Sequence, residues 1–67
     1  MSRQSKFGKQ LKELRKALGL SQQEIAEVAN VSRFSVISWE KGRGVPDALQ
    51  LFDIAKELGR DVRDFEV

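Results

Sequence analysis

The segment SQQEIAEVANVSRFSVISWEKG, residues 21–42, decides the fold because it contains two short helical patterns separated by a very short turn. The first helix is expected to begin at a capping box made by Ser21 and Glu24, whose side chains satisfy free backbone N–H groups. Asn30 is among the few residues besides glycine that accept a left-handed backbone, so we expect the helix to end there. Ser32, two positions later, is a suitable N-cap for a second helix.

The turn between these two helices is so short that it limits how they can pack. Helices of about eight to ten residues joined by only about three or four cannot lie antiparallel over their whole lengths, so they are expected to cross sharply. Ala26 provides the small side chain that a close crossing needs, while Val36 and Trp39 provide apolar contacts from the second helix. Residues 21–42 are therefore predicted to form a helix-turn-helix that ends at Gly42.

The outward face of the second of these helices carries an unusual set of side chains. Val36 and Trp39 define the inward direction, because successive residues of a helix are rotated by about 100°. The residues that point most nearly the other way are Phe34, Ile37, Ser38 and Lys41, with Arg33 and Ser35 on the flanks. Phe34 is expected either to be exposed for a function or to fold back over Val31 or a partner chain, since single exposed apolar residues are common.

The rest of the chain contains signals for three more helices. One precedes Gly19 and has a predicted buried stripe, at helical spacing, of Phe7, Leu11, Leu14 and Leu18. Another lies between a second capping box, at Asp47 and Gln50, and a stop at Gly59. Its predicted inward residues are Leu51, Ile54, Ala55 and Leu58.

A last short helix is expected between a cap at Asp61 and Phe65. No stretch alternates β-branched and polar residues as a strand would. The sequence therefore predicts an all-α, five-helix fold in one domain, residues 1–67, with the helix-turn-helix at about residues 21–42.

The composition excludes several classes of function. The chain has 67 residues and contains no His, Cys or Tyr, so it lacks the commonest metal ligand, a thiol nucleophile and the usual proton carriers. We expect no disulfide, no metal or other cofactor, and no enzymatic activity. The basic, polar N-terminus resembles neither a signal peptide nor a membrane span, which predicts a cytoplasmic protein without membrane contact.

The charge is polarised along the chain. Residues 1–20 hold six basic side chains and one acidic one, whereas residues 45–67 hold three basic and six acidic ones. The basic end could face a polyanion while the acidic end points away from it. The same pattern would also arise from solvated helix faces that differ in sign.

Two segments resemble the Cro/C1-type helix-turn-helix family of phage repressors and their bacterial relatives. They are FGKQLKELRKALGLSQQEIAEVANVSRFSVISWEKGR, residues 7–43, and LFDIAKELGRDVRDF, residues 51–65. The specific part is the ordered set Gln22, Ala26, Val31, Val36, Trp39, Glu40 and Gly42. Asn30 departs from the family, which usually has glycine in the turn, but asparagine accepts the same backbone conformation.

The resemblance implies a lambda-repressor-like DNA-binding domain. Such a protein would bind double-stranded DNA sequence-specifically as a symmetric homodimer on an inverted-repeat operator, and would regulate transcription as a repressor. An antitoxin that also binds a partner protein shares this fold, as do some coactivator domains that only bind proteins. An apolar, unpartnered patch near the C-terminus would favour such a protein partner.

The resemblance also assigns base-reading positions to the two helices of the helix-turn-helix, the one after Ser21 and the one after Ser32. The residues that match them are Gln22, Arg33, Phe34, Ser35 and Ser38. Arg33 can bond the O6 and N7 of guanine, and Phe34 can meet the C5-methyl group of thymine. The matching position of Gln22 also holds a phosphate and often touches the recognition helix.

Phosphate contacts are expected from cations and amides near the end of the helix that follows Ser32, and from the helix that precedes Gly19. The candidates are Gln22, Lys41, Gly42, Arg43, Gly44 and Lys9. For the two glycines the backbone N–H is the expected donor, because a residue without a side chain lets the chain approach closely.

Two further sets of residues are predicted to be structural. In the family, an arginine at the position of Arg15 pairs with the glutamate at the position of Glu40, and the guanidinium can fork onto the carboxylate. A two-fold interface is expected on the last two helices, which carry more apolar residues than one core face uses. Its candidates are Phe52, Arg60, Val62, Phe65 and Val67, although Phe65 could instead complete the core.

Overall fold

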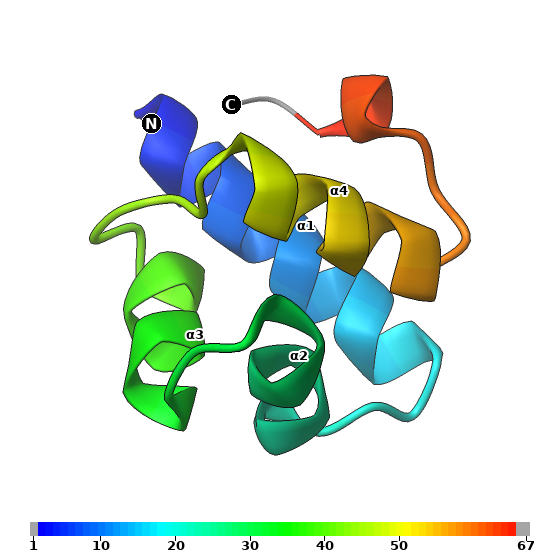
Figure 1. Cartoon of the computed structure of the whole chain (residues 1–67). Coiled ribbons are helices and arrows are strands. Elements are labelled where there is room, and N and C mark those ends of the chain that lie inside the picture. Colours follow the sequence, from blue (N-terminus) through cyan, green and yellow to red (C-terminus); the bar gives the residue numbers. More distant parts are fainter. Residues whose placement is uncertain (1, 66–67) are drawn as a thin grey trace.

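The computed structural model describes residues 2–65 and shows an all-helical fold (Figure 1). Its elements are α1 (Arg3–Ala17), α2 (Gln22–Ala29), α3 (Arg33–Glu40), α4 (Ala48–Glu57) and the 3-10 helix η1 (Val62–Asp64). Residues 2–65 contain no β-strand. The all-α class is confirmed, but the count of five α-helices was wrong. Only three residues separate the Asp61 cap from Phe65, which is enough for one 3-10 turn and too few for an α-helix.

The two predicted capping boxes are present. Ser21 Oγ accepts from the Glu24 N–H at 3.0 Å, and the Ser21 N–H donates to Glu24 Oε1 at 3.2 Å. The equivalent pair at the start of α4 has distances of 2.8 Å and 2.9 Å. At η1, the backbone and side chain of Arg63 donate to the Asp61 carboxylate, and the side-chain bond is the largest cause of the lowered pKa of Asp61.

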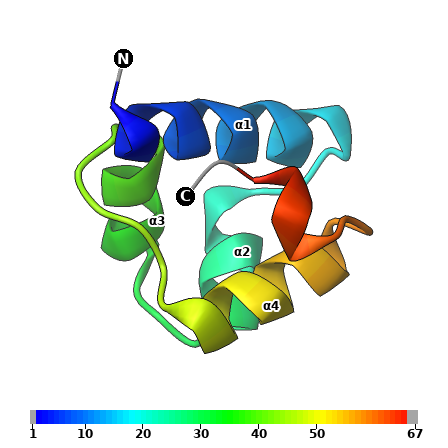
Figure 2. The same cartoon turned by 90° about the horizontal axis from the view of Figure 1, so that it is seen from above.

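One hydrophobic core unites all the helices. Its buried members are Phe7, Leu11, Ile25, Ala26, Ala29, Val36, Trp39, Leu51, Ile54, Ala55, Leu58 and Phe65. All the residues predicted to lie inward on the second, third and fourth helices are therefore confirmed as buried: Ala26, Val36, Trp39, Leu51, Ile54, Ala55 and Leu58. Figure 2 shows α1 along one side of this core and α2, α3 and α4 opposite it.

The predicted burial of the apolar stripe of α1 was wrong for its last residue. Phe7 and Leu11 are fully buried and Leu14 is partly buried, but Leu18 is 53% exposed. Leu18 is the C-cap, one residue beyond the last helical residue, and the chain turns directly after it. Leu20 packs against the core instead, because the helix extends past the end of the core before the turn brings the chain back.

The helix-turn-helix forms through the predicted left-handed residue. Asn30 has φ 57° and ψ 46°, and the Val31 N–H donates to the Ala26 carbonyl oxygen at 2.9 Å. Ser32 occupies the N-cap position of α3, but its side chain bonds no helical N–H, so the prediction of a side-chain cap was wrong there. The first turn is held by the backbone, with the Ser35 N–H donating to the Ser32 carbonyl oxygen at 3.0 Å.

Gly8 lets α1 and α3 approach until their backbones touch. A Cβ atom at this position would collide with the Trp39 carbonyl oxygen and lie 3.0 Å from the Glu40 carbonyl carbon. Sequence reasoning missed this contact. A glycine inside a helix costs about 1 kcal/mol relative to alanine, so its presence in the middle of α1 was the available signal.

Gly8→Ala is expected to lower the free energy of unfolding by about 1–3 kcal/mol, since the clash outweighs the better helix propensity of alanine. Urea denaturation followed by circular dichroism measures the change. Gly19→Ala is a control without this clash, because a Cβ there would meet nothing within 4 Å and only its left-handed backbone, φ 70°, is strained. An unchanged or higher stability of Gly8→Ala would contradict the close approach.

Candidate nucleic-acid interface

The outer face of α3 is exposed while its inner face is buried. Val36 is fully buried and Trp39 is 7% exposed, whereas Phe34 is 76% exposed. Arg33 is also exposed, and the remaining outward residues, Ser35, Ile37 and Ser38, are half-buried. The helix thus presents a cation and an aromatic ring to solvent from its first turn, and Phe34 does not fold back over Val31.

The residues that follow α3 add exposed cations. The helix stops at Glu40, and Lys41 and Arg43 are both exposed. The Gly42 N–H donates to the Trp39 carbonyl oxygen at 3.0 Å. This amide is engaged in ending the helix and is not free for a phosphate, which corrects that prediction. The Gly44 N–H makes no hydrogen bond with any group of residues 2–65.

A buried ion pair braces α1 against α3. Arg15 Nε donates to Glu40 Oε2 at 2.7 Å and Arg15 Nη2 donates to Glu40 Oε1 at 3.1 Å. The side chains are only 10% and 4% exposed. Arg15 Nη1 also donates to the Leu20 carbonyl oxygen at 2.9 Å, so the guanidinium is fixed from two sides.

Gln22 joins the same carboxylate. Its Nε2 donates to Glu40 Oε1 at 3.1 Å, so the first residue of α2 is tied to the last residue of α3. The family resemblance indicated a contact with the recognition helix, but neither the partner nor its coupling to Arg15 could be read from the sequence.

A polar hollow lies where α2 and α3 begin. It has a volume of about 360 Å³ and is lined by Arg15, Ser21, Gln22, Gln23 and Arg33. The first N–H groups of a helix have no partner within the helix, and the capping box satisfies only those of Ser21 and Glu24. The Arg33 guanidinium and the helix N-terminus make this hollow suited to an anion such as a phosphate, whereas the charge of Arg15 is already paired with Glu40.

The predicted two-fold interface is only partly at the surface. Phe52 is 58% exposed, and it lines a shallow hollow of about 350 Å³ together with Arg60 and the half-buried Val62. Phe65 is 5% exposed and its ring lies 5.5 Å from that of Phe7, so Phe65 completes the core and its assignment to the interface was wrong. Val67 lies outside the described residues.

Two exposed apolar residues, one on α4 and one in the loop before it, were missed. Leu49 is 76% exposed and Val45 is 39% exposed. Leu49 precedes Phe52 by three residues on α4, which places the two side chains on one face of the helix. That spacing was the signal in the sequence. We refer to Leu49, Phe52 and Val62 as the α4 patch.

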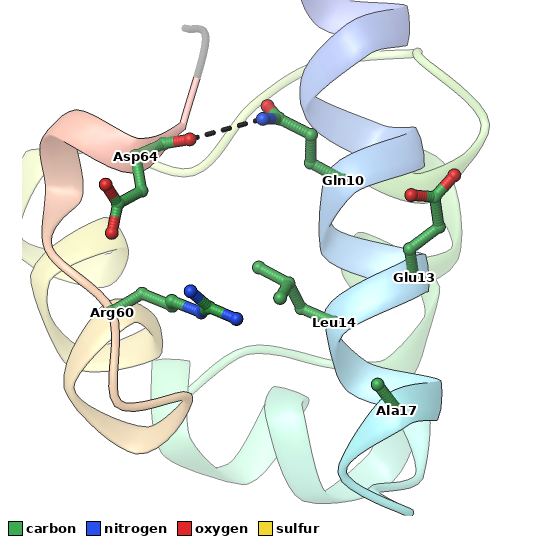
Figure 3. Close-up of a pocket in the computed structure, with 6 residues that line it drawn as sticks. All are labelled: Gln10, Glu13, Leu14, Ala17, Arg60 and Asp64. Atoms are coloured by element: carbon green, nitrogen blue, oxygen red, sulfur yellow. Dashed lines mark hydrogen bonds between the residues drawn. The ribbon is translucent and has the colours of Figure 1, made fainter.

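A third hollow, of about 410 Å³, lies between α1 and residues 60–64 (Figure 3). The Arg60 side chain extends across it toward Leu14, and Gln10 Nε2 donates to the Asp64 carbonyl oxygen at 3.2 Å. Glu13 and Ala17 complete its lining. This contact, with the Phe7–Phe65 ring pair, attaches η1 to α1.

Residues 2–65 contain no helix that is long and apolar enough to span a membrane, and no group of acidic, Cys or His side chains arranged to hold a metal ion. The combination of a sharp helix-turn-helix, an exposed recognition helix and flanking cations defines a DNA-binding domain of a transcriptional regulator. Residues 11–65 match the model of the family HTH_3, described as "Helix-turn-helix", and the chain belongs to this family.

Relatives support the same class. An HTH-type transcriptional regulator of Methanothermobacter thermautotrophicus is 45% identical over 51 residues, which are 76% of this chain and 74% of that protein. The transcriptional activator BcrR of Enterococcus faecalis is 38% identical over 50 residues, 75% of this chain but only 24% of that protein.

A solved structure has a closely similar fold. The restriction-modification controller protein C.AhdI of Aeromonas hydrophila superposes with a TM-score of 0.82 at 33% identity, covering 91% of this chain and 92% of that one. These proteins are transcriptional regulators and controllers rather than enzymes, in agreement with the expectation from composition.

Proposed function

We propose that this chain is a repressor that binds double-stranded DNA sequence-specifically, as a homodimer on an inverted-repeat operator, with α3 in the major groove. The observation that carries the proposal is the division of α3 into a buried face, Val36 and Trp39, and an outer face from which Arg33 and Phe34 project into solvent. The N-terminal part of a recognition helix is the part that reaches base edges, and both side chains lie there.

Base reading is assigned to the outer face of α3 and phosphate binding to its surroundings. Arg33 would bond guanine, Phe34 would contact a thymine methyl group, and Ser35 and Ser38 would bond base edges or phosphates. The residues proposed to hold phosphates are Gln22, Lys9, Lys41, Arg43 and the Gly44 amide. Each phosphate neutralised by a cation should add about 0.9 to the slope of log K against log salt concentration.

The homodimer is proposed to form through the α4 patch. Its apolar residues lie on and beside α4, and a two-fold axis would pair them with their copies and set two half-sites about one DNA turn apart. A dimer seated on its operator excludes other proteins from that DNA, which favours repression.

The same patch supports a second candidate function, in which a different protein covers α4, as in an antitoxin. Sedimentation at increasing protein concentration separates the two. Self-association is expected for the homodimer, whereas a monomer at all concentrations, with and without operator DNA, would favour a partner protein.

Selection of bound duplexes from a random pool at physiological salt tests the proposed function. We expect the pool to converge on an inverted repeat whose half-sites are about 10 base pairs apart, centre to centre. A single half-site would contradict the dimer. A pool that does not converge would contradict sequence-specific binding.

Phe34→Ala is expected to weaken binding to the selected site by about 1 kcal/mol, since about that much is lost when one or two apolar groups leave contact. The same site with uracil in place of thymine lacks the C5-methyl groups, so the substitution should cost much less there. Fluorescence anisotropy titrations of both proteins on both duplexes measure this. Equal losses on the two duplexes would remove the methyl contact.

A further inference from the structure

The Glu40 carboxylate is a buried polar group that links α1, α2 and α3. It accepts three hydrogen bonds, from Arg15 Nε and Nη2 and from Gln22 Nε2, and its side chain is 4% exposed. Arg15 is fully explained as a brace between α1 and α3. The Gln22 contact is different, because Gln22 lines the hollow at the start of α2 and α3, where a phosphate is proposed to bind.

From this geometry we propose that Glu40 is a positioning residue for DNA binding, acting through Gln22; this inference rests on the proposed function. An ionised carboxylate offers only acceptors, so it selects the amide nitrogen of Gln22 and excludes the rotated amide. The side-chain oxygen of Gln22, Oε1, then lies on the other branch of the side-chain amide, away from Glu40. The positions of Nε2 and Oε1 are therefore fixed before any ligand binds.

The ion pair makes this arrangement rigid. Arg15 holds both carboxylate oxygens of Glu40 at 2.7 Å and 3.1 Å, and it is itself held by the Leu20 carbonyl oxygen. A glutamine side chain that is not held by a partner loses rotamer freedom when it meets DNA. Because the carboxylate already holds the Gln22 side chain, binding DNA costs less side-chain entropy. The ion pair inside the fold therefore also orients a contact at the surface.

A double-mutant cycle on DNA affinity tests the proposal. Glu40→Gln leaves one acceptor oxygen for the three N–H groups that the carboxylate now holds, and Gln22→Met keeps the length of the side chain without its amide. We expect Glu40→Gln to weaken operator binding about three- to tenfold with Gln22 present, which corresponds to freeing one ordered side chain. In the Gln22→Met background the same change should cost less than about twofold.

The cycle separates positioning from mere stabilisation. Affinities are compared at a temperature where circular dichroism shows all four proteins folded. An equal loss in both backgrounds would show that Glu40 acts only by holding α1 to α3, and would overturn the proposal. If the unsubstituted chain bound all duplexes alike, the proposed function would fail instead.

A measurement on the unsubstituted protein keeps the proposal falsifiable if Glu40→Gln does not fold. Gln23 is the matched control, because it follows Gln22 directly and is exposed. We expect the NMR order parameter of the Gln22 side-chain amide to approach the value of about 0.85 of a rigid backbone, and that of Gln23 to lie below about 0.6. Equal, low values for both side chains would overturn the positioning role.

Discussion

Arg15→Ala is expected to lower the free energy of unfolding by about 3–5 kcal/mol. The substitution leaves the Glu40 carboxylate, whose side chain is 4% exposed, without its charged partner. A chain of this length is expected to have a total stability of only about 3–10 kcal/mol. The variant should therefore be partly unfolded at room temperature, and urea denaturation followed by circular dichroism would show the shift of its midpoint.

The chain offers a matched control for this prediction. Arg63 also donates to a carboxylate, with Nε 3.1 Å from Asp61 Oδ1, but the side chains of that pair are 88% and 50% exposed. Arg63→Ala is expected to change stability little, because water replaces an exposed ion pair. If both arginine variants lost equal stability, burial of the Arg15–Glu40 pair would not be the reason for its importance.

Arg33→Ala is expected to weaken binding to the selected operator by about 1–3 kcal/mol, the discrimination that one bidentate contact with guanine provides. Binding to a duplex of random sequence should fall much less, because phosphate contacts there do not require a guanine. Titrations of both duplexes at one fixed salt concentration measure the two losses.

Arg43→Ala is the control for a lost charge. Arg43 is exposed in the loop after α3, so its removal should weaken both duplexes alike and lower the salt slope by about 0.9. If Arg33→Ala behaved in the same way, Arg33 would be a phosphate contact and the guanine assignment would be contradicted.

Local signals explain why so much of the fold was predictable. The capping boxes at Ser21 and Asp47 join residues three positions apart, and the left-handed turn depends on Asn30 alone. The inward faces of the middle helices follow from helical periodicity. The position of the outward face of α3 followed from the same periodicity, since Val36 and Trp39 had to be inside.

Packing at a distance explains what was missed. Whether Phe65 lay in the core or at the surface depended on whether an aromatic residue of the core faced it. The ring of Phe7 does face it. The role of Gly8 depended on how closely α3 crosses α1, and Leu18 became exposed because the core ends before the helix does. The Gly42 N–H donates to the Trp39 carbonyl oxygen, and this hydrogen bond could be predicted only by knowing the residue at which α3 ends.

The amino-acid sequence by itself determined the helices, the sharp turn at Asn30 and the residues that α3 turns outward, because each depends on interactions within a few positions of the chain. The tertiary structure alone decided which surfaces remain open and how Gln22 is held by Glu40. Those properties depend on contacts between residues 18 and 25 positions apart, and only the packed core brings such residues within hydrogen-bond distance.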